Sequence, residues 1–188
     1  MENRRYPTDA EAKKLIVEIG RRMYAKNFVA ANDGNISCKV DENTIWTTPT
    51  GVSKGFMTED MLVKLRLDGT VISQGERGPS SEVKMHLRVY NENPEVGGVC
   101  HAHPPAATAF ACAHMGLEEP LLGEAVMSLG PVPCAPYGRT GTAELPAAAA
   151  PVGGAAPCPE PRHDGIPVQT EKYAPRAARR RTKRFRRV

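Results

Sequence analysis

The chain has 188 residues and a formal net charge of +4 at pH 7, and its composition, 40% hydrophobic and 24% charged, is that of one globular domain with room for a tail. No run of 18 apolar residues and no apolar leader occurs, so we expect no membrane span, no secretory signal and a cytoplasmic location. The five cysteines lack CxxC spacing, which favours reduced thiols over a disulfide framework.

The first half of the chain predicts a helix followed by hairpin strands. Thr8 and Glu11 have the spacing of a capping box, and apolar residues then recur at helical spacing as far as Met23. A turn precedes the first strand, and a glycine-containing loop and a short helix capped by Thr58 precede the third. The three strands are expected at residues 36–40, 44–48 and 62–67.

The second half predicts two more helices around a short buried strand. Strands that form hairpins, with helices between them, indicate an α/β (α+β) fold with a largely antiparallel sheet covered by helices. The proline-broken segment 129–137 is expected to be an edge strand or a loop. The other elements are a helix at 80–91, a strand at 95–103 and a helix at 106–113.

The composition of the chain changes near residue 145. Lys and Arg number 15 against 18 Asp and Glu in residues 1–145, but 10 against 3 in residues 146–188, where Ala, Arg, Pro and Gly make up 27 of the 43 residues. We therefore predict one domain over 1–145 and a disordered cationic tail over 146–188. Such a tail could bind nucleic acid non-specifically, or it could arise from altered reading of a GC-rich gene. We favour the second origin.

His101 and His103 carry the strongest chemical signal. Residues i and i+2 of a strand point to the same face, so both imidazoles are expected to project together from the end of the strand. This arrangement commonly supplies two nitrogen ligands to zinc or a similar divalent ion. The alternative is that they are two ordinary histidines near a strand end.

Three loops have the residues of an anion site. A glycine permits a positive φ and lets a ligand approach backbone N–H groups, and serines at a helix start add free N–H groups and the helix dipole. Each loop alone is more often a plain turn or cap, but together they indicate a phosphate. The candidate phosphate-binding residues are Gly34, Asn35, Thr50, Gly51, Ser80 and Ser81.

Glu82 follows the two serines in the first turn of the predicted helix. Beside a metal and a phosphate it could act as a general base, whereas alone it would be a surface residue favoured by the helix dipole. His86 lies one turn further on the same face, and we interpret it as a packing or hydrogen-bonding residue.

Five sequence blocks occur in the order NDGNIS, TPTGVSKGFM, SSEVKMHL, HAHPPAATAFA and GPVPCAPYG. Together they resemble the class II aldolase/adducin family over about residues 8–145, and L-fuculose-phosphate aldolase most closely. The resemblance implies a three-layer α/β/α sandwich around a mostly antiparallel sheet. It also implies a cyclic homotetramer with the active site between subunits.

The resemblance assigns a role to each candidate residue. His101 and His103 match two zinc ligands, Glu82 matches the acid/base carboxylate, and Tyr137 matches an aromatic residue presented near a neighbouring subunit's site. The glycine, amide and hydroxyl residues of the three loops match the phosphate-binding positions. The implied reaction is zinc-dependent cleavage of a ketose 1-phosphate to dihydroxyacetone phosphate and an aldehyde.

One part of the family pattern is absent. The family supplies a third histidine about 50–60 residues after the pair, whereas the context of His163 resembles no family motif. We therefore expect an incomplete C-terminal part, weak metal binding and little activity. The alternatives are a pentulose-phosphate 4-epimerase, a thiosugar-phosphate dehydratase and a non-catalytic adducin-like binding module. A nucleic-acid binder acting through the basic tail is a further class.

Overall fold

A six-stranded sheet forms the centre of the computed structural model, which describes residues 6–119, 122–128, 130–136 and 168–169. The strand order is β4-β3-β2-β1-β5-β6, and every neighbouring pair is antiparallel except β5 and β6. The strands are β1 (Asn35–Lys39), β2 (Thr44–Thr47), β3 (Val63–Arg66), β4 (Val71–Ser73), β5 (Gly98–His101) and β6 (Val168–Gln169). The helices are α1 (Asp9–Ala25), the 3-10 turn η1 (Glu59–Met61), α2 (Val83–Glu92), α3 (Pro105–Cys112) and α4 (Gly123–Ser128).

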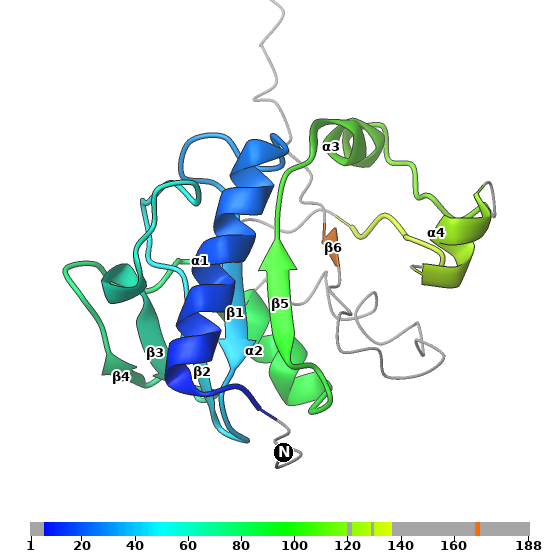
Figure 1. The fold of residues 1–188 in the computed structure, drawn as a ribbon. Coiled ribbons are helices and arrows are strands. Elements are labelled where there is room, and N and C mark those ends of the chain that lie inside the picture. Colours follow the sequence, from blue (N-terminus) through cyan, green and yellow to red (C-terminus); the bar gives the residue numbers. More distant parts are fainter. Residues whose placement is uncertain (1–5, 120–121, 129, 137–167, 170–188) are drawn as a thin grey trace, which may run out of the picture.

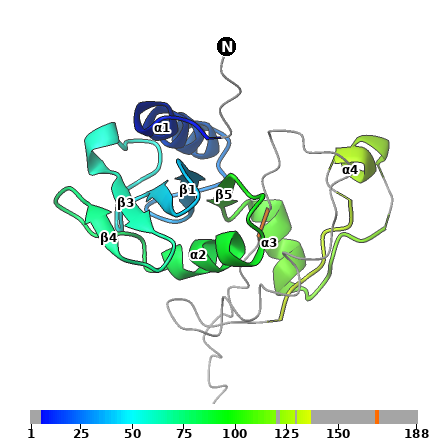
Figure 2. The same cartoon turned by 90° about the horizontal axis from the view of Figure 1, so that it is seen from below.

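Helices cover both faces of the sheet, with α1 on one side and α2 on the other (Figures 1 and 2). Successive side chains of a strand point to opposite faces, so each face has its own apolar cluster. Ile36 and Trp46 pack with α1, whereas Ile45 and Val99 pack with Tyr90 of α2. This confirms the predicted three-layer sandwich with a mostly antiparallel sheet.

The start of α1 is fixed by the predicted capping box. The Thr8 hydroxyl accepts a hydrogen bond from the Glu11 amide at 3.3 Å, and the Glu11 carboxylate accepts one from the Thr8 amide at 2.7 Å. Further along, α1 lies close to the loop after β2. A Cβ added at Gly20 would lie 2.6 Å from the Lys54 carbonyl oxygen, so only glycine allows this approach. The helix therefore supports the loop that holds two candidate phosphate-binding residues.

Several boundaries differ from those predicted. Strand β5 ends at His101 and not at His103, because the His103 amide donates to the Phe28 carbonyl, 2.8 Å away, in place of a strand partner. Glu82 is the residue before α2 and not in its first turn. The exposed strand β4 and helix α4 have no counterpart in the sequence-based prediction.

The predicted tail falls largely outside the described residues. Its described part is β6, whose Val168 and Gln169 pair with Cys100 and His101 of β5. The domain division at residue 145 therefore stays a prediction. Among the described residues, no helix is both long enough and apolar enough to span a membrane.

Candidate active site

A ladder of polar groups joins β1 to α2 and to the residues at the two ends of that helix, on the face of the sheet that α2 covers. Four residues of a helix rise about 6 Å, and two residues of a strand rise about 6.6 Å. Every second residue of β1 can therefore contact every fourth residue along α2 and its ends. The ladder consists of Asn35, Ser37 and Lys39 on one side and Glu82, His86, Tyr90 and Pro94 on the other. The sheet is therefore polar here, whereas β2 and β3 present apolar residues to the same helix.

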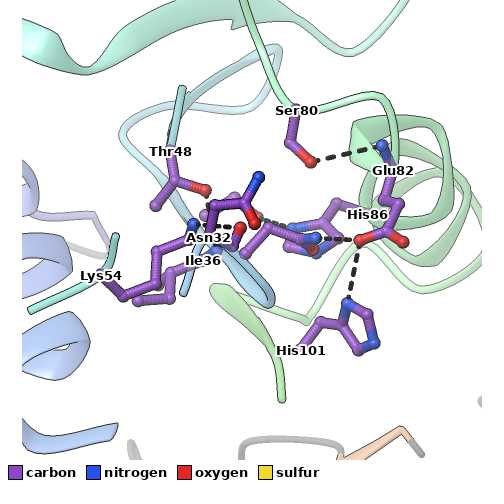
Figure 3. Close-up of polar contacts among 10 residues, drawn as sticks. Asn32, Ile36, Thr48, Lys54, Ser80, Glu82, His86 and His101 are labelled. Atoms are coloured by element: carbon purple, nitrogen blue, oxygen red, sulfur yellow. Dashed lines mark hydrogen bonds and ion pairs between the residues drawn. The ribbon is translucent and has the colours of Figure 1, made fainter. Parts of the chain in front are cut away.

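Glu82 lies where the ladder meets β5. Its Oε2 accepts a hydrogen bond from the Asn35 side-chain amide. The same oxygen lies 3.2 Å from Nδ1 of His101 (Figure 3). Asn35 and His101 are directly opposite each other in the β1–β5 pairing, so one carboxylate can reach both. The Glu82 side chain is 16% exposed and His101 is fully buried, so the carboxylate stands at the border between solvent and the sheet.

The surroundings of Glu82 keep its carboxyl group ionised. Burial raises its pKa, but the hydrogen bond and charge of His101 and the hydrogen bond from Asn35 outweigh burial. The net effect holds the pKa of Glu82 well below its usual range. At neutral pH the group is therefore a carboxylate that can receive a proton.

His86 is a buried, neutral part of the same ladder. Its Nδ1 lies 2.7 Å from the Ser37 hydroxyl, which lies 2.8 Å from the Tyr90 hydroxyl. Burial is the main reason that the pKa of His86 falls to about 3. Its Nε2 is buried and has no hydrogen-bond partner among the described residues. The contacts confirm His86 as a hydrogen-bonding residue and place it one helical turn from Glu82.

The two histidines of the His-X-His segment lie side by side, as predicted. Their ring centroids are 4.7 Å apart with an angle of 61° between the planes. Burial lowers the pKa of His103, which favours the neutral form that binds metals. In donor type and proximity, His101 and His103 fit a two-nitrogen ligand pair for a divalent ion. Within the described residues, no group of three or more His, Cys, Asp or Glu side chains is arranged to hold a metal.

Backbone hydrogen bonds bring two of the predicted phosphate loops together. The Thr50 amide donates to the Gly78 carbonyl at 3.0 Å, and the Ser80 amide donates to the Thr48 carbonyl at 3.2 Å. The Ser80 hydroxyl in turn accepts from the Glu82 amide at 3.4 Å (Figure 3). These bonds tie the Thr50 loop and the serines to the start of α2, next to the carboxylate.

The third loop is shaped by Gly34 and by a lysine that the sequence reading left out. Gly34 has φ +70°, and a Cβ there would lie 2.6 Å from Val29 Cγ1 and 2.7 Å from the His101 carbonyl oxygen. The ammonium of Lys54 is buried and donates to the Asn32 carbonyl at 3.1 Å (Figure 3). It also donates to the Val52 carbonyl at 2.7 Å. Burial lowers the pKa of Lys54. Lys54 thus joins two loops and is already occupied by backbone carbonyls.

Asn35 lies against the carboxylate. Its side-chain amide donates a hydrogen bond to Glu82, and because the amide has a second N–H, its predicted role in phosphate binding stays a prediction. Tyr137 lies outside the described residues, as does His163. Arg77, which lies beside Gly51, was missed because a lone arginine in a loop belongs to no motif.

Comparison with known proteins finds relatives over most of the chain. It is 32% identical over 142 residues to the 3-oxo-tetronate 4-phosphate decarboxylase of Haemophilus influenzae, covering 73% of this chain and 67% of that one. It is 33% identical over 129 residues to the L-fuculose phosphate aldolase of Methanococcus maripaludis, covering 69% of each. A methylthioribulose-1-phosphate dehydratase of Acidiphilium cryptum is 38% identical over 104 residues, covering 55% of this chain and 49% of that one. The chain thus spans between half and about two thirds of these relatives.

Solved structures and a family model agree with these relatives. An L-fuculose 1-phosphate aldolase superposes with a TM-score of 0.72 and 26% identity over 80% of this chain and 70% of that one. YgbL of Klebsiella pneumoniae gives a TM-score of 0.72 and 28% identity over 79% and 73%. The model of the class II aldolase and adducin N-terminal domain matches residues 14–159, which extends past the predicted boundary at 145. The chain belongs to the class II aldolase/adducin family.

Proposed function

We propose that this chain is a metal-assisted lyase that acts on a small sugar phosphate, in the manner of an L-fuculose-phosphate aldolase. One observation carries the proposal. Glu82 is an ionised carboxylate held between Asn35 and His101, at the point where the loops of Thr50 and Ser80 reach α2. A carboxylate, a pair of histidines and the loops predicted to bind a phosphate therefore lie around one position.

The reactions named for two of the relatives converge on one fragment. L-Fuculose 1-phosphate releases dihydroxyacetone phosphate when the bond between C3 and C4 breaks. Loss of carbon dioxide from 3-oxo-tetronate 4-phosphate leaves the same compound. In each case the electron pair of the broken bond stays on the carbon next to the carbonyl, as an enediolate, and that carbon must receive a proton. The shared requirements are a phosphate site and a proton donor at that carbon.

We assign this proton transfer to Glu82. As a carboxylate it can take the proton from the hydroxyl of the aldol substrate when the carbon–carbon bond breaks, and then deliver it to the enediolate carbon. Asn35 and the buried ladder fix its orientation, and positioned acid/base groups commonly contribute roughly 10²–10⁴-fold to the rate. Thr50, Ser80 and Ser81 are expected to hold the phosphate, which sets the distance between the reacting carbon and the carboxylate.

His101 and His103 would hold the divalent ion, zinc or a metal of similar preference. When bound, the ion would supply Lewis-acid polarisation of the substrate's carbonyl. The His101 Nδ1 faces Glu82, which leaves the other ring nitrogen of His101 as the one for a metal. The contact with Glu82 then orients the ring.

A second candidate is decarboxylation, which was not among the alternatives drawn from the sequence. The similarity to the decarboxylase of Haemophilus influenzae over 73% of this chain favours it. A dehydratase would remove a proton beside the carbonyl and then release a hydroxyl group. The similarity to the dehydratase relative covers a smaller share of this chain, 55%. The epimerase and the non-catalytic module remain predictions of the sequence reading, as does the homotetramer.

The test is an assay of the 188-residue chain with L-fuculose 1-phosphate and, separately, 3-oxo-tetronate 4-phosphate, with and without added zinc. Release of dihydroxyacetone phosphate with an aldehyde identifies the aldolase, and release with carbon dioxide identifies the decarboxylase. Slow turnover that rises with zinc is expected, because two ligands hold the ion weakly. The variant Ser81→Ala should mainly raise KM. No turnover of either compound at saturating zinc contradicts the proposal and favours a non-catalytic module.

A further inference from the structure

The guanidinium of Arg77 lies beside Gly51, in the loop between β4 and α2. A Cβ built on Gly51 would come within 2.9 Å of Arg77 Nη1, and Gly51 has φ +68°. The two loops are fixed to each other by the hydrogen bond from the Thr50 amide to the Gly78 carbonyl, next to both residues. The backbone next to Arg77 is therefore held against the Thr50–Gly51 turn.

Arg77 is available to a ligand, in contrast to the nearest buried cation. It is exposed, and within the part of the chain that the structure describes it forms no ion pair. Lys54 also lies in this region, but its ammonium is buried and donates to two backbone carbonyls. The guanidinium of Arg77 can thus pair with an anion at the Thr50–Gly51 turn, whereas the Lys54 ammonium is committed to backbone carbonyls.

A nearby cation strengthens the binding of a phosphate ester. The ester carries a charge of about −1.5 to −2 at pH 7, and hydroxyl and amide donors carry no full positive charge to offset it. The planar guanidinium can donate two parallel hydrogen bonds to phosphate oxygens, which are shorter and stronger than bonds between neutral groups. Gly51 has no side chain, so the phosphate can approach both the turn and the guanidinium.

We propose that Arg77 binds the phosphate group of the substrate together with Thr50 and Gly51, and that it sets the preference for a phosphorylated sugar over a neutral one. The inference rests on the proposed function, because it takes the Thr50 loop as the place where the substrate's phosphate binds. Arg77 acts on binding and lies apart from the proton transfer at Glu82.

The test uses inorganic phosphate as the probe and isothermal titration calorimetry of the full chain as the measurement. Loss of a charge-assisted pair of hydrogen bonds in Arg77→Gln should weaken phosphate binding roughly 10- to 100-fold. Arg77→Lys keeps the charge but loses the paired donors of the guanidinium, so its phosphate affinity should lie between those of the unchanged chain and Arg77→Gln. Arg66→Gln is the matched control, because Arg66 is an exposed arginine on β3 and its loss changes the net charge equally. Equal affinities of Arg77→Gln and Arg66→Gln, or no phosphate binding by the unchanged chain, would overturn the inference.

Kinetics separate this inference from the proposed function. With a turned-over sugar phosphate, Arg77→Gln should raise KM by a similar factor and leave kcat nearly unchanged. Turnover with the same KM in both proteins refutes the role of Arg77 and leaves the proposed function intact. Weakened phosphate binding in Arg77→Gln, with no turnover of either sugar phosphate by the unchanged chain, supports the role of Arg77 and contradicts the proposed reaction.

Discussion

Replacement of Ser37 by alanine tests the buried ladder that positions Glu82. The hydroxyl of Ser37 lies between His86 Nδ1 and the Tyr90 hydroxyl, and all three residues are at most 2% exposed. The variant leaves His86 with neither ring nitrogen paired to a described residue, whereas Tyr90 keeps its hydrogen bond to the Val99 backbone. An unsatisfied buried polar atom costs roughly 1–3 kcal/mol, and loss of the hydrogen bond to Tyr90 adds about 1 kcal/mol. We therefore expect Ser37→Ala to lower the free energy of unfolding by about 2–4 kcal/mol.

Urea denaturation followed by circular dichroism measures this change, with Tyr90→Phe as the matched control. The phenylalanine keeps the ring in the apolar cluster and leaves the contact between Ser37 and His86 intact, so its cost should be near 1 kcal/mol. The m-value should stay the same in both variants. A Ser37→Ala variant no less stable than Tyr90→Phe would refute the view that the hydroxyl satisfies two buried partners.

Three further predictions concern pH, backbone shape and metal. The pKa of His86 lies near 3 in the folded chain against about 6.5 unfolded, so the unfolded state binds the extra proton and stability falls as pH drops from about 6.5 towards 3, by about 1.4 kcal/mol per unit. In His86→Gln this part of the slope between pH 6.5 and 4.5 should vanish in urea titrations, and an unchanged slope would contradict the assignment. Gly34→Ala places a Cβ within 2.7 Å of the His101 carbonyl oxygen, at a residue with φ +70°. The left-handed conformation alone costs roughly 1–2 kcal/mol for an L residue, so with the added clash we expect the free energy of unfolding to fall by more than about 2 kcal/mol. A variant as stable as the unchanged chain would show that the loop is not constrained. After dialysis, metal analysis should find much less than one zinc per chain, because His101 and His103 lack a third ligand among the described residues; stoichiometric zinc would point to a ligand beyond them.

Local signals explain the parts of the fold that the sequence predicted correctly. The capping box of Thr8 and the helical apolar stripe place α1, and the two prolines place the start of α3. These signals act between residues close in the chain, so they can be read without knowing the fold. Strand β4 was missed because its three residues are all exposed and show no apolar alternation, and helix α4 because its six residues are too few to show a period.

The sequence analysis named the residues of the candidate site but did not predict the contacts between them. His101, His103 and Glu82 were identified, yet the bond from Asn35 to Glu82 depends on β1 lying next to β5 in one register and α2 lying across both. Residues 35 and 82 are far apart in the sequence, so no local pattern could show that the Asn35 amide serves the carboxylate. Lys54 and Arg77 were missed for a related reason. Each is a single cation in a loop, and its role depends on contacts with another loop that the sequence does not show.

Hydrogen exchange into dihydroxyacetone phosphate tests the central claim most directly, because both the aldolase and the decarboxylase require proton transfer at the same carbon. The compound is incubated with the chain and zinc in deuterium oxide, and proton NMR follows the hydroxymethyl carbon next to the carbonyl. The unchanged chain should exchange hydrogen there, and Glu82→Gln, which keeps the size and removes the base, should exchange at least about 100-fold more slowly. Equal exchange by the two proteins would contradict the assignment of Glu82 as the group that moves the proton.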